Sequence, residues 1–122
     1  MSDIKNNELA LRVLLIAFLS FGASGCASTI YQWNGYDSTL YKHYKHPDQT
    51  EIFLQEIKQI VDLAENEKRV PPGMYAEYGY LLYQAQQYGE ALIYFKQEQE
   101  RWPESHVIMK KMIANTEKLA KQ

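Results

Sequence analysis

The sequence predicts an all-α protein, a small stack of about four helices. Apolar residues recur at helical spacing along three stretches of its second half, and prolines separate these stretches. One stretch has the length and pattern of a helical hairpin. The 122 residues suffice for one small domain. A net charge of −2 excludes the basic surface that nucleic-acid binding requires.

The hairpin covers residues 72–105. Both of its helices carry aromatic and aliphatic residues three or four positions apart: Tyr75, Tyr78 and Leu82, then Tyr88, Leu92 and Phe95. Gly79 interrupts the first helix, where glycine costs about 1 kcal/mol relative to alanine. We therefore expect a close approach of the two helices at Gly79. Pro103 ends the second helix.

This hairpin resembles a tetratricopeptide (TPR) repeat, whose unit is 34 residues long. Glu98 departs from the pattern, because alanine is usual there, and it predicts a looser second helix with a solvated carboxylate. In TPR hairpins the first helix lines a concave groove. The resemblance therefore implies that Ala76, Tyr80, Tyr83 and Gln84 face a binding partner.

A helix is expected on each side of the hairpin, because a single repeat unit cannot bury its apolar faces alone. The helix before it carries an apolar stripe: Phe53, Leu54, Ile57, Ile60, Val61 and Ala64. Asp48 is expected to cap that helix. The helix after it begins near Ser105, and its predicted apolar face holds Val107, Ile108, Met112, Ile113 and Leu119. Met109 and Met112 are expected to fill the core. Residues 48–122 thus form the predicted TPR-like domain.

The N-terminus reads as a targeting segment. Residues 13–21 are apolar but too short for a membrane span of about 20 residues, and they suit the core of a signal peptide. The small residues before Cys26 resemble a bacterial lipobox, which implies a signal peptide over residues 1–25 and acyl chains such as palmitate on Cys26. Ordinary cleavage after Ala27 is the alternative. No aspartate follows Cys26, which favours the outer membrane, facing the periplasm.

Residues 26–47 form an aromatic arm between the lipidated cysteine and the helical domain. Trp33 and Tyr36 are too apolar for a solvated linker. Either they pack onto the helical domain, where the arm could fill the groove, or they contact a partner, since Trp and Tyr are enriched in binding hot spots. His43 and His46 lie three residues apart, but Pro47 follows them and no third ligand does, so we expect surface histidines and no metal.

Four motifs together resemble a known family. They are the lipobox, Tyr31-Gln32-Trp33 with Gly35-Tyr36, Val70-Pro71-Pro72-Gly73 and Trp102-Pro103-Glu104-Ser105. This set is similar to the bacterial lipoprotein family called domain of unknown function 4810. Its members are small envelope lipoproteins whose genes commonly neighbour one for a curli-assembly-type lipoprotein. The resemblance implies a shared envelope complex and no established activity.

The leading functional hypothesis is a lipid-anchored, TPR-like interaction module. It would be an accessory subunit of an outer-membrane assembly or secretion complex that contains a curli-assembly-type lipoprotein. The alternative is a structural or regulatory lipoprotein that binds peptidoglycan or a cell-wall enzyme. Catalysis is not expected, because the single cysteine carries lipid and no nucleophile is paired with a base. No cofactor is expected either.

Overall fold

The computed structural model describes residues 7–8 and 30–121. Over residues 30–121 the chain forms five α-helices and one short 3₁₀ helix, with no strand in this part. They are α2 (Tyr36–Lys45), α3 (Thr50–Asn66), α4 (Met74–Gln84), α5 (Tyr88–Arg101), η2 (Pro103–Ser105) and α6 (His106–Leu119). The predicted all-α class is confirmed. The arm contributes α2, a ten-residue helix, which brings the stack to five helices.

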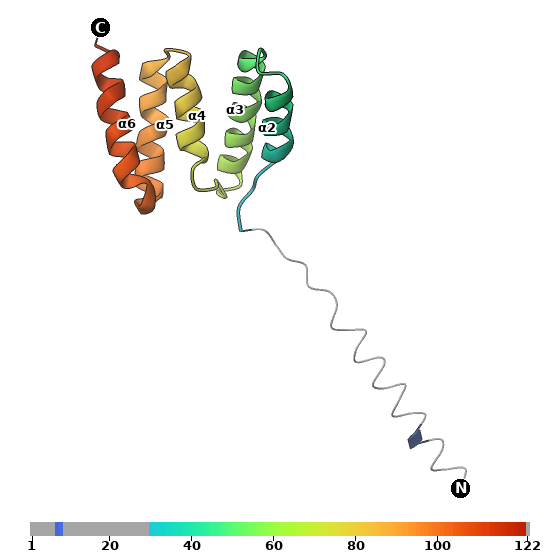
Figure 1. The fold of residues 1–122 in the computed structure, drawn as a ribbon. Helices are drawn as coiled ribbons and strands as arrows, with labels where there is room; N and C mark the ends of the chain where they lie inside the picture. The colour runs from blue at the N-terminus through green and yellow to red at the C-terminus, as the bar shows by residue number, and fades with distance from the viewer. Residues whose placement is uncertain (1–6, 9–29, 122) are drawn as a thin grey trace.

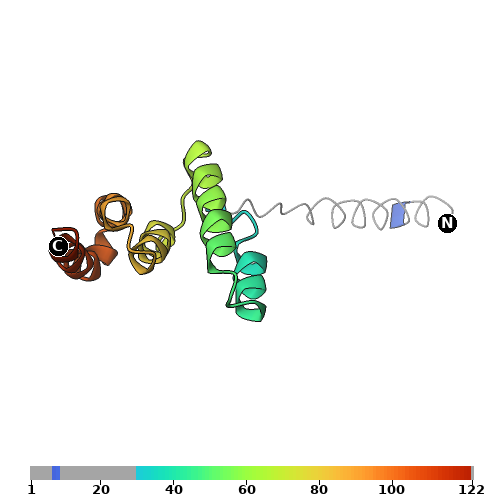
Figure 2. The ribbon, with the colours of Figure 1, turned by 90° about the horizontal axis from the view of Figure 1, so that it is seen from above.

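The helices stand side by side in chain order, and each packs against the next from α2 to α6 (Figure 1). Seen from above, α5 lies nearly end-on whereas α3 is inclined to it (Figure 2). Short connections alternate between the two ends of the row. One end therefore holds the start of α2, the α3–α4 connector and η2, and the other holds the α4–α5 turn and the C-terminus.

The core lies between α3, α4 and α5. All six residues of the predicted stripe on α3 are buried, which confirms that face: Phe53, Leu54, Ile57, Ile60, Val61 and Ala64. Each large apolar side chain buried in this way stabilises the fold by about 1.5–3 kcal/mol. The predicted aspartate cap of α3 is wrong, because the helix begins at Thr50 with Gln49 as its N-cap and no side-chain cap bond.

The close approach of α4 and α5 at Gly79 is confirmed. A Cβ atom at this position would lie 2.9 Å from two ring carbons of Phe95 and 3.3 Å from the carbonyl oxygen of Ala91. Phe95 and Ala91 are both fully buried. Glycine is therefore required here by space. As predicted, α5 ends just before Pro103.

Glu98 is buried, so the prediction of a solvated carboxylate on a looser helix is wrong. Its side chain is 0% exposed, and its Oε1 accepts hydrogen bonds from the Gly73 amide and the Ser105 hydroxyl, both at 2.8 Å. Gly73 begins α4 with φ +87°, a left-handed conformation that glycine adopts without steric cost. Glu98 thus links the start of α4, the body of α5 and the start of α6.

Only part of the predicted apolar face of α6 packs against the core. Val107 and Ile108 are 70% and 59% exposed, whereas Met109 and Thr116 are buried. With the half-buried Met112 and Ile113, these two form a stripe at i, i+3, i+4 and i+7 against the core. Thr116 is tolerated there because its hydroxyl donates to the Met112 carbonyl at 2.7 Å, within the helix. Ser105 precedes α6 as predicted, but its hydroxyl bonds Glu98 rather than the helix.

Candidate partner-binding surface

The surface predicted from the TPR resemblance lies on the outer side of α4. Met74, Tyr75, Tyr78, Leu81 and Leu82 point into the core. At 100° per residue the opposite side carries a second set: Ala76, Glu77, Tyr80, Tyr83 and Gln84. Of these, Tyr80 and Gln84 are exposed and the other three are half-buried. We call this second set the α4 outer face.

Three tyrosines gather at the C-terminal end of this face. The rings of Tyr80 and Tyr83 are stacked, with centroids 6.2 Å apart and planes 13° apart. Tyr88, the first residue of α5, meets the Tyr83 ring edge-on at 5.6 Å. Tyr83 packs against the core, while Tyr80 is 47% exposed. These three residues form the tyrosine cluster, a broad aromatic surface supported from beneath.

The arm reaches the other end of the same face. The Tyr36 hydroxyl donates a hydrogen bond to Oε2 of Glu77 on α4, and the Tyr36 ring packs against the core. Burial, together with this hydrogen bond, raises the pKa of the Tyr36 hydroxyl. Trp33 lies against Tyr36 with ring centroids 5.8 Å apart and is 46% exposed. Tyr36 therefore packs onto the helical domain, and Trp33 is held beside it.

The predicted binding residues accordingly form two groups rather than one. Trp33 and Tyr36 lie by the N-terminal half of α4, near Ala76, whereas Tyr80, Tyr83 and Gln84 lie on its C-terminal half. From Glu77 to Gln84 the helix rises about 10 Å. The arm covers one end of the α4 outer face by way of Tyr36 and leaves Tyr80 and Gln84 exposed.

Two residues of this surface were not predicted as site residues. Glu77 holds Tyr36, and Tyr88 completes the tyrosine cluster. The pattern gave no signal for Glu77, because its partner lies 41 positions earlier in the chain. Tyr88 was assigned to the core face of its helix, yet it follows the turn directly and remains half-buried beside Tyr83.

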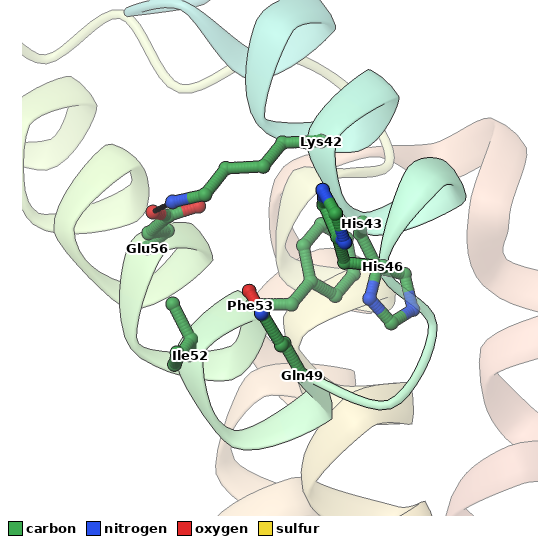
Figure 3. A pocket seen from close by; sticks show the side chains of 7 residues that line it. All are labelled: Lys42, His43, His46, Gln49, Ile52, Phe53 and Glu56. Carbon is green, nitrogen blue, oxygen red and sulfur yellow. Dashed lines mark hydrogen bonds and ion pairs between the residues drawn. The ribbon is translucent and has the colours of Figure 1, made fainter.

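A separate small hollow lies between α2 and α3 (Figure 3). It is lined by Lys42, His43, His46, Gln49, Ile52, Phe53 and Glu56. The His43 ring stacks on Phe53 with centroids 4.1 Å apart, and Lys42 forms an ion pair with Glu56. Within the described residues, no group of three or more His, Cys, Asp or Glu side chains could hold a metal ion. The histidine serves here as a flat packing surface between the two helices.

The predicted lipidation site lies outside the described residues. This holds for Cys26 and for residues 1–6 and 9–25 of the predicted signal peptide. In the described part of the chain, none of the helices combines the length and the apolar character needed to cross a bilayer.

Comparison with known proteins gives one match. Residues 30–112 match the family described as Domain of unknown function (DUF4810). This segment contains residues 30–47 of the arm, the α4 outer face and the first half of α6. No curated protein and no solved structure matches the chain.

Proposed function

We propose that this protein, which belongs to the DUF4810 family, is a lipid-anchored interaction module that faces the periplasm. In this proposal it is an accessory subunit of an outer-membrane assembly or secretion complex, and its partner is a curli-assembly-type lipoprotein. Cys26 carries the acyl chains, and the α4 outer face receives the partner.

The observation that carries the proposal is the tyrosine cluster. Tyr80 is nearly half exposed and rests on Tyr83, which is packed in turn against Tyr88 and the core. Tyrosine has few rotatable bonds and buries a large area, so it contributes to binding at a low entropy cost. An exposed aromatic residue on a rigid base is the usual form of a binding hot spot.

The hairpin geometry supports the TPR-like part of the proposal. Gly79 lets α4 and α5 approach closely, as the small residues of TPR hairpins do, and Ala91 lies opposite it. In TPR hairpins the first helix of each pair lines the groove. By this likeness, the α4 outer face would line the groove here. Tyr36 occupies the arm end of this face, so a partner would bind at the end formed by Tyr80, Tyr83 and Gln84.

The anchor rests on the lipobox resemblance around Cys26. One acyl chain gives marginal membrane binding, whereas two or more hold a protein stably. A bacterial lipoprotein carries two or three chains on its cysteine. Such an anchor would keep the module and a second lipoprotein on the same membrane, which raises their effective concentration for each other.

The test is site-specific photocrosslinking in intact cells that produce the full chain. A photoreactive amino acid replaces Tyr80, and the matched control replaces Gln55, an exposed residue of α3. We expect the curli-assembly-type lipoprotein in the Tyr80 adduct and not in the Gln55 adduct. In the unlabelled protein, Tyr80→Ala with Tyr83→Ala should weaken capture of this lipoprotein by about 30-fold, the effect of a hot spot worth roughly 2 kcal/mol.

Two results would contradict the proposal. An equal yield of the adduct from Tyr80 and Gln55 would remove the α4 outer face as the binding surface. A Tyr80 adduct with peptidoglycan or a cell-wall enzyme would favour the structural or regulatory role instead, provided that Tyr80→Ala with Tyr83→Ala also weakens capture of that same partner by the unlabelled protein. Helix content measured by circular dichroism separates lost binding from lost folding.

A further inference from the structure

The arm is fixed to one end of the helical stack. The Gln32 amide donates to the Arg69 carbonyl at 3.0 Å, and the Tyr31 ring meets Trp102 edge-on at 5.7 Å. This end is made of residues 30–35, the α3–α4 connector at residues 67–73, η2 and the first turn of α6. We call it the entry end; in Figure 1 it is the lower end, where the arm joins α2.

The entry end exposes four large apolar side chains. Ile30 is 79% exposed, and Trp33 is nearly half exposed beside Tyr36. Val107 and Ile108 open α6 at the same end and are also exposed. These four residues contribute little to the core, so their burial against something outside the domain would be favourable.

Basic side chains lie at or beside the same end as these apolar residues. Lys68, Arg69 and Arg101 are all exposed, and the Arg101 guanidinium donates to the Lys68 carbonyl at 3.3 Å. Four exposed carboxylates lie at or beside this end as well: Asp37, Glu67, Glu100 and Glu104. Lys68 and Arg69 are therefore an adjacent basic pair within an end whose charges nearly balance. A tryptophan beside aliphatic and basic side chains is the composition that proteins place at the level of lipid headgroups.

The distance to the proposed anchor decides what this end meets. Ile30 follows Cys26 by four residues, and an extended chain spans at most about 3.6 Å per residue. An acylated Cys26 would hold Ile30 within roughly 14 Å of the bilayer. Because Tyr31 and Gln32 are fixed to the domain, the same limit brings the part of the entry end beside them near the bilayer, and not only a loose tether.

We propose that the entry end rests on a phospholipid surface, with Ile30, Trp33, Val107 and Ile108 at headgroup level. Lys68, Arg69 and Arg101 lie near the phosphates. This inference rests on the proposed lipid anchor and adds an orientation to it. Tyr80 and Tyr83 lie roughly 9 and 14 Å along α4 from its first residue, so the tyrosine cluster then faces away from the membrane.

The two tryptophans of the chain, Trp33 and Trp102, both lie at the entry end, so intrinsic fluorescence tests the orientation. The lipidated full-length product is placed in vesicles that contain brominated phospholipid, which quenches nearby tryptophan. Trp102→Phe leaves Trp33 alone as the reporter. A matched variant carries Tyr80→Trp with Trp33→Phe and Trp102→Phe, and reports on the far end.

We expect quenching of Trp33 at least about threefold stronger than in the Tyr80→Trp variant, since headgroup-level side chains reach roughly 5–10 Å into the interface. Raising the anionic lipid fraction should strengthen this quenching. Lys68→Gln with Arg69→Gln should remove the added effect, whereas Lys96→Gln with Lys118→Gln should not. The protein without substitutions gives a second measurement of quenching, because both of its tryptophans lie at the entry end.

The outcomes separate the orientation from the anchor. If the protein floats with vesicles but both reporters are quenched equally, the orientation is wrong and the anchor stands. If it fails to float, the anchor fails and the orientation with it. If Trp33 is not quenched and a crosslinker at Ile30 joins two copies of the protein, the entry end binds a second copy of this chain. That result would overturn the inference.

Discussion

At the scale of single residues, Glu98 does what an alanine at the same position could not. One carboxylate oxygen joins the Gly73 amide and the Ser105 hydroxyl, residues that lie 25 positions before it and 7 after it. The other oxygen, Oε2, is buried without a hydrogen-bond partner among the described residues. The contact therefore combines two good hydrogen bonds with an incompletely satisfied buried carboxylate.

Substitution of Glu98 tests this balance. Glu98→Ala should lower the free energy of unfolding by about 3 kcal/mol, because it opens a cavity and removes the acceptor of two hydrogen bonds, from the Gly73 amide and the Ser105 hydroxyl. Glu98→Gln keeps an acceptor oxygen and removes the charge, so it should cost less than about 1 kcal/mol. Urea denaturation measures both. Equal losses in the two variants would show that the carboxylate charge itself is required.

At the scale of elements, packing between helices decides which residue types are allowed. The α4–α5 pair needs glycine at position 79, because Phe95 fills the space that a side chain would take. On α6 the face is set by the contacts with α5 and η2, and this places Thr116 in the core while Val107 stays outside. Hydrophobicity alone would order these two residues the other way.

Two glycine substitutions test the close approach. Gly79→Ala gains about 1 kcal/mol of helix propensity but overpacks the core by about 1–3 kcal/mol, so we expect a net destabilisation of about 1 kcal/mol. Gly89→Ala is the matched control: it lies in the first turn of α5, and an added Cβ meets nothing within 4 Å. It should stabilise the fold by about 0.5–1 kcal/mol. Thermal and urea unfolding measure the change in the free energy of unfolding for both variants. A Gly79→Ala variant that is more stable than the parent protein would contradict the close approach of α4 and α5.

At the scale of the whole molecule, buried and half-buried tyrosines connect the central helices α3, α4 and α5. Tyr94 of α5 meets Tyr78 of α4 edge-on at 4.6 Å and Tyr75 at 6.2 Å. Burial, then a hydrogen bond to Glu65, raises the pKa of Tyr75 to about 12. Burial also raises the pKa of Tyr78 and of Tyr94. The folded state therefore favours the protonated form of these hydroxyls.

This preference predicts loss of stability in alkali. Between about pH 10, where tyrosine ionises in the unfolded chain, and about pH 12, the folded state holds more protons. Raising the pH then favours unfolding, by up to about 1.4 kcal/mol per pH unit for each retained proton. Below about pH 10 the stabilisation is complete.

Urea denaturation across this pH range measures the slope. Tyr75→Phe should reduce the slope by up to one proton, whereas Tyr44→Phe, at an exposed position on α2, should leave it unchanged. The same slope in the Tyr75→Phe variant as in the parent protein would contradict the assignment.

The sequence by itself determined the helical class, the stripe on α3, the close contact at Gly79 and the end of α5 at Pro103. These features depend on neighbours within one or two helical turns, or on an intrinsic limit of glycine or proline.

Only the tertiary structure decided the burial of Glu98, the rotation of α6 and the position of the arm against α4. Each depends on a partner that becomes adjacent only after the helices pack: Gly73 for Glu98, α5 for Thr116, and Glu77 for Tyr36. A linear pattern contains the side chains of such pairs but not the distance between them, and that distance decides whether a polar group is hydrated or satisfied inside the fold.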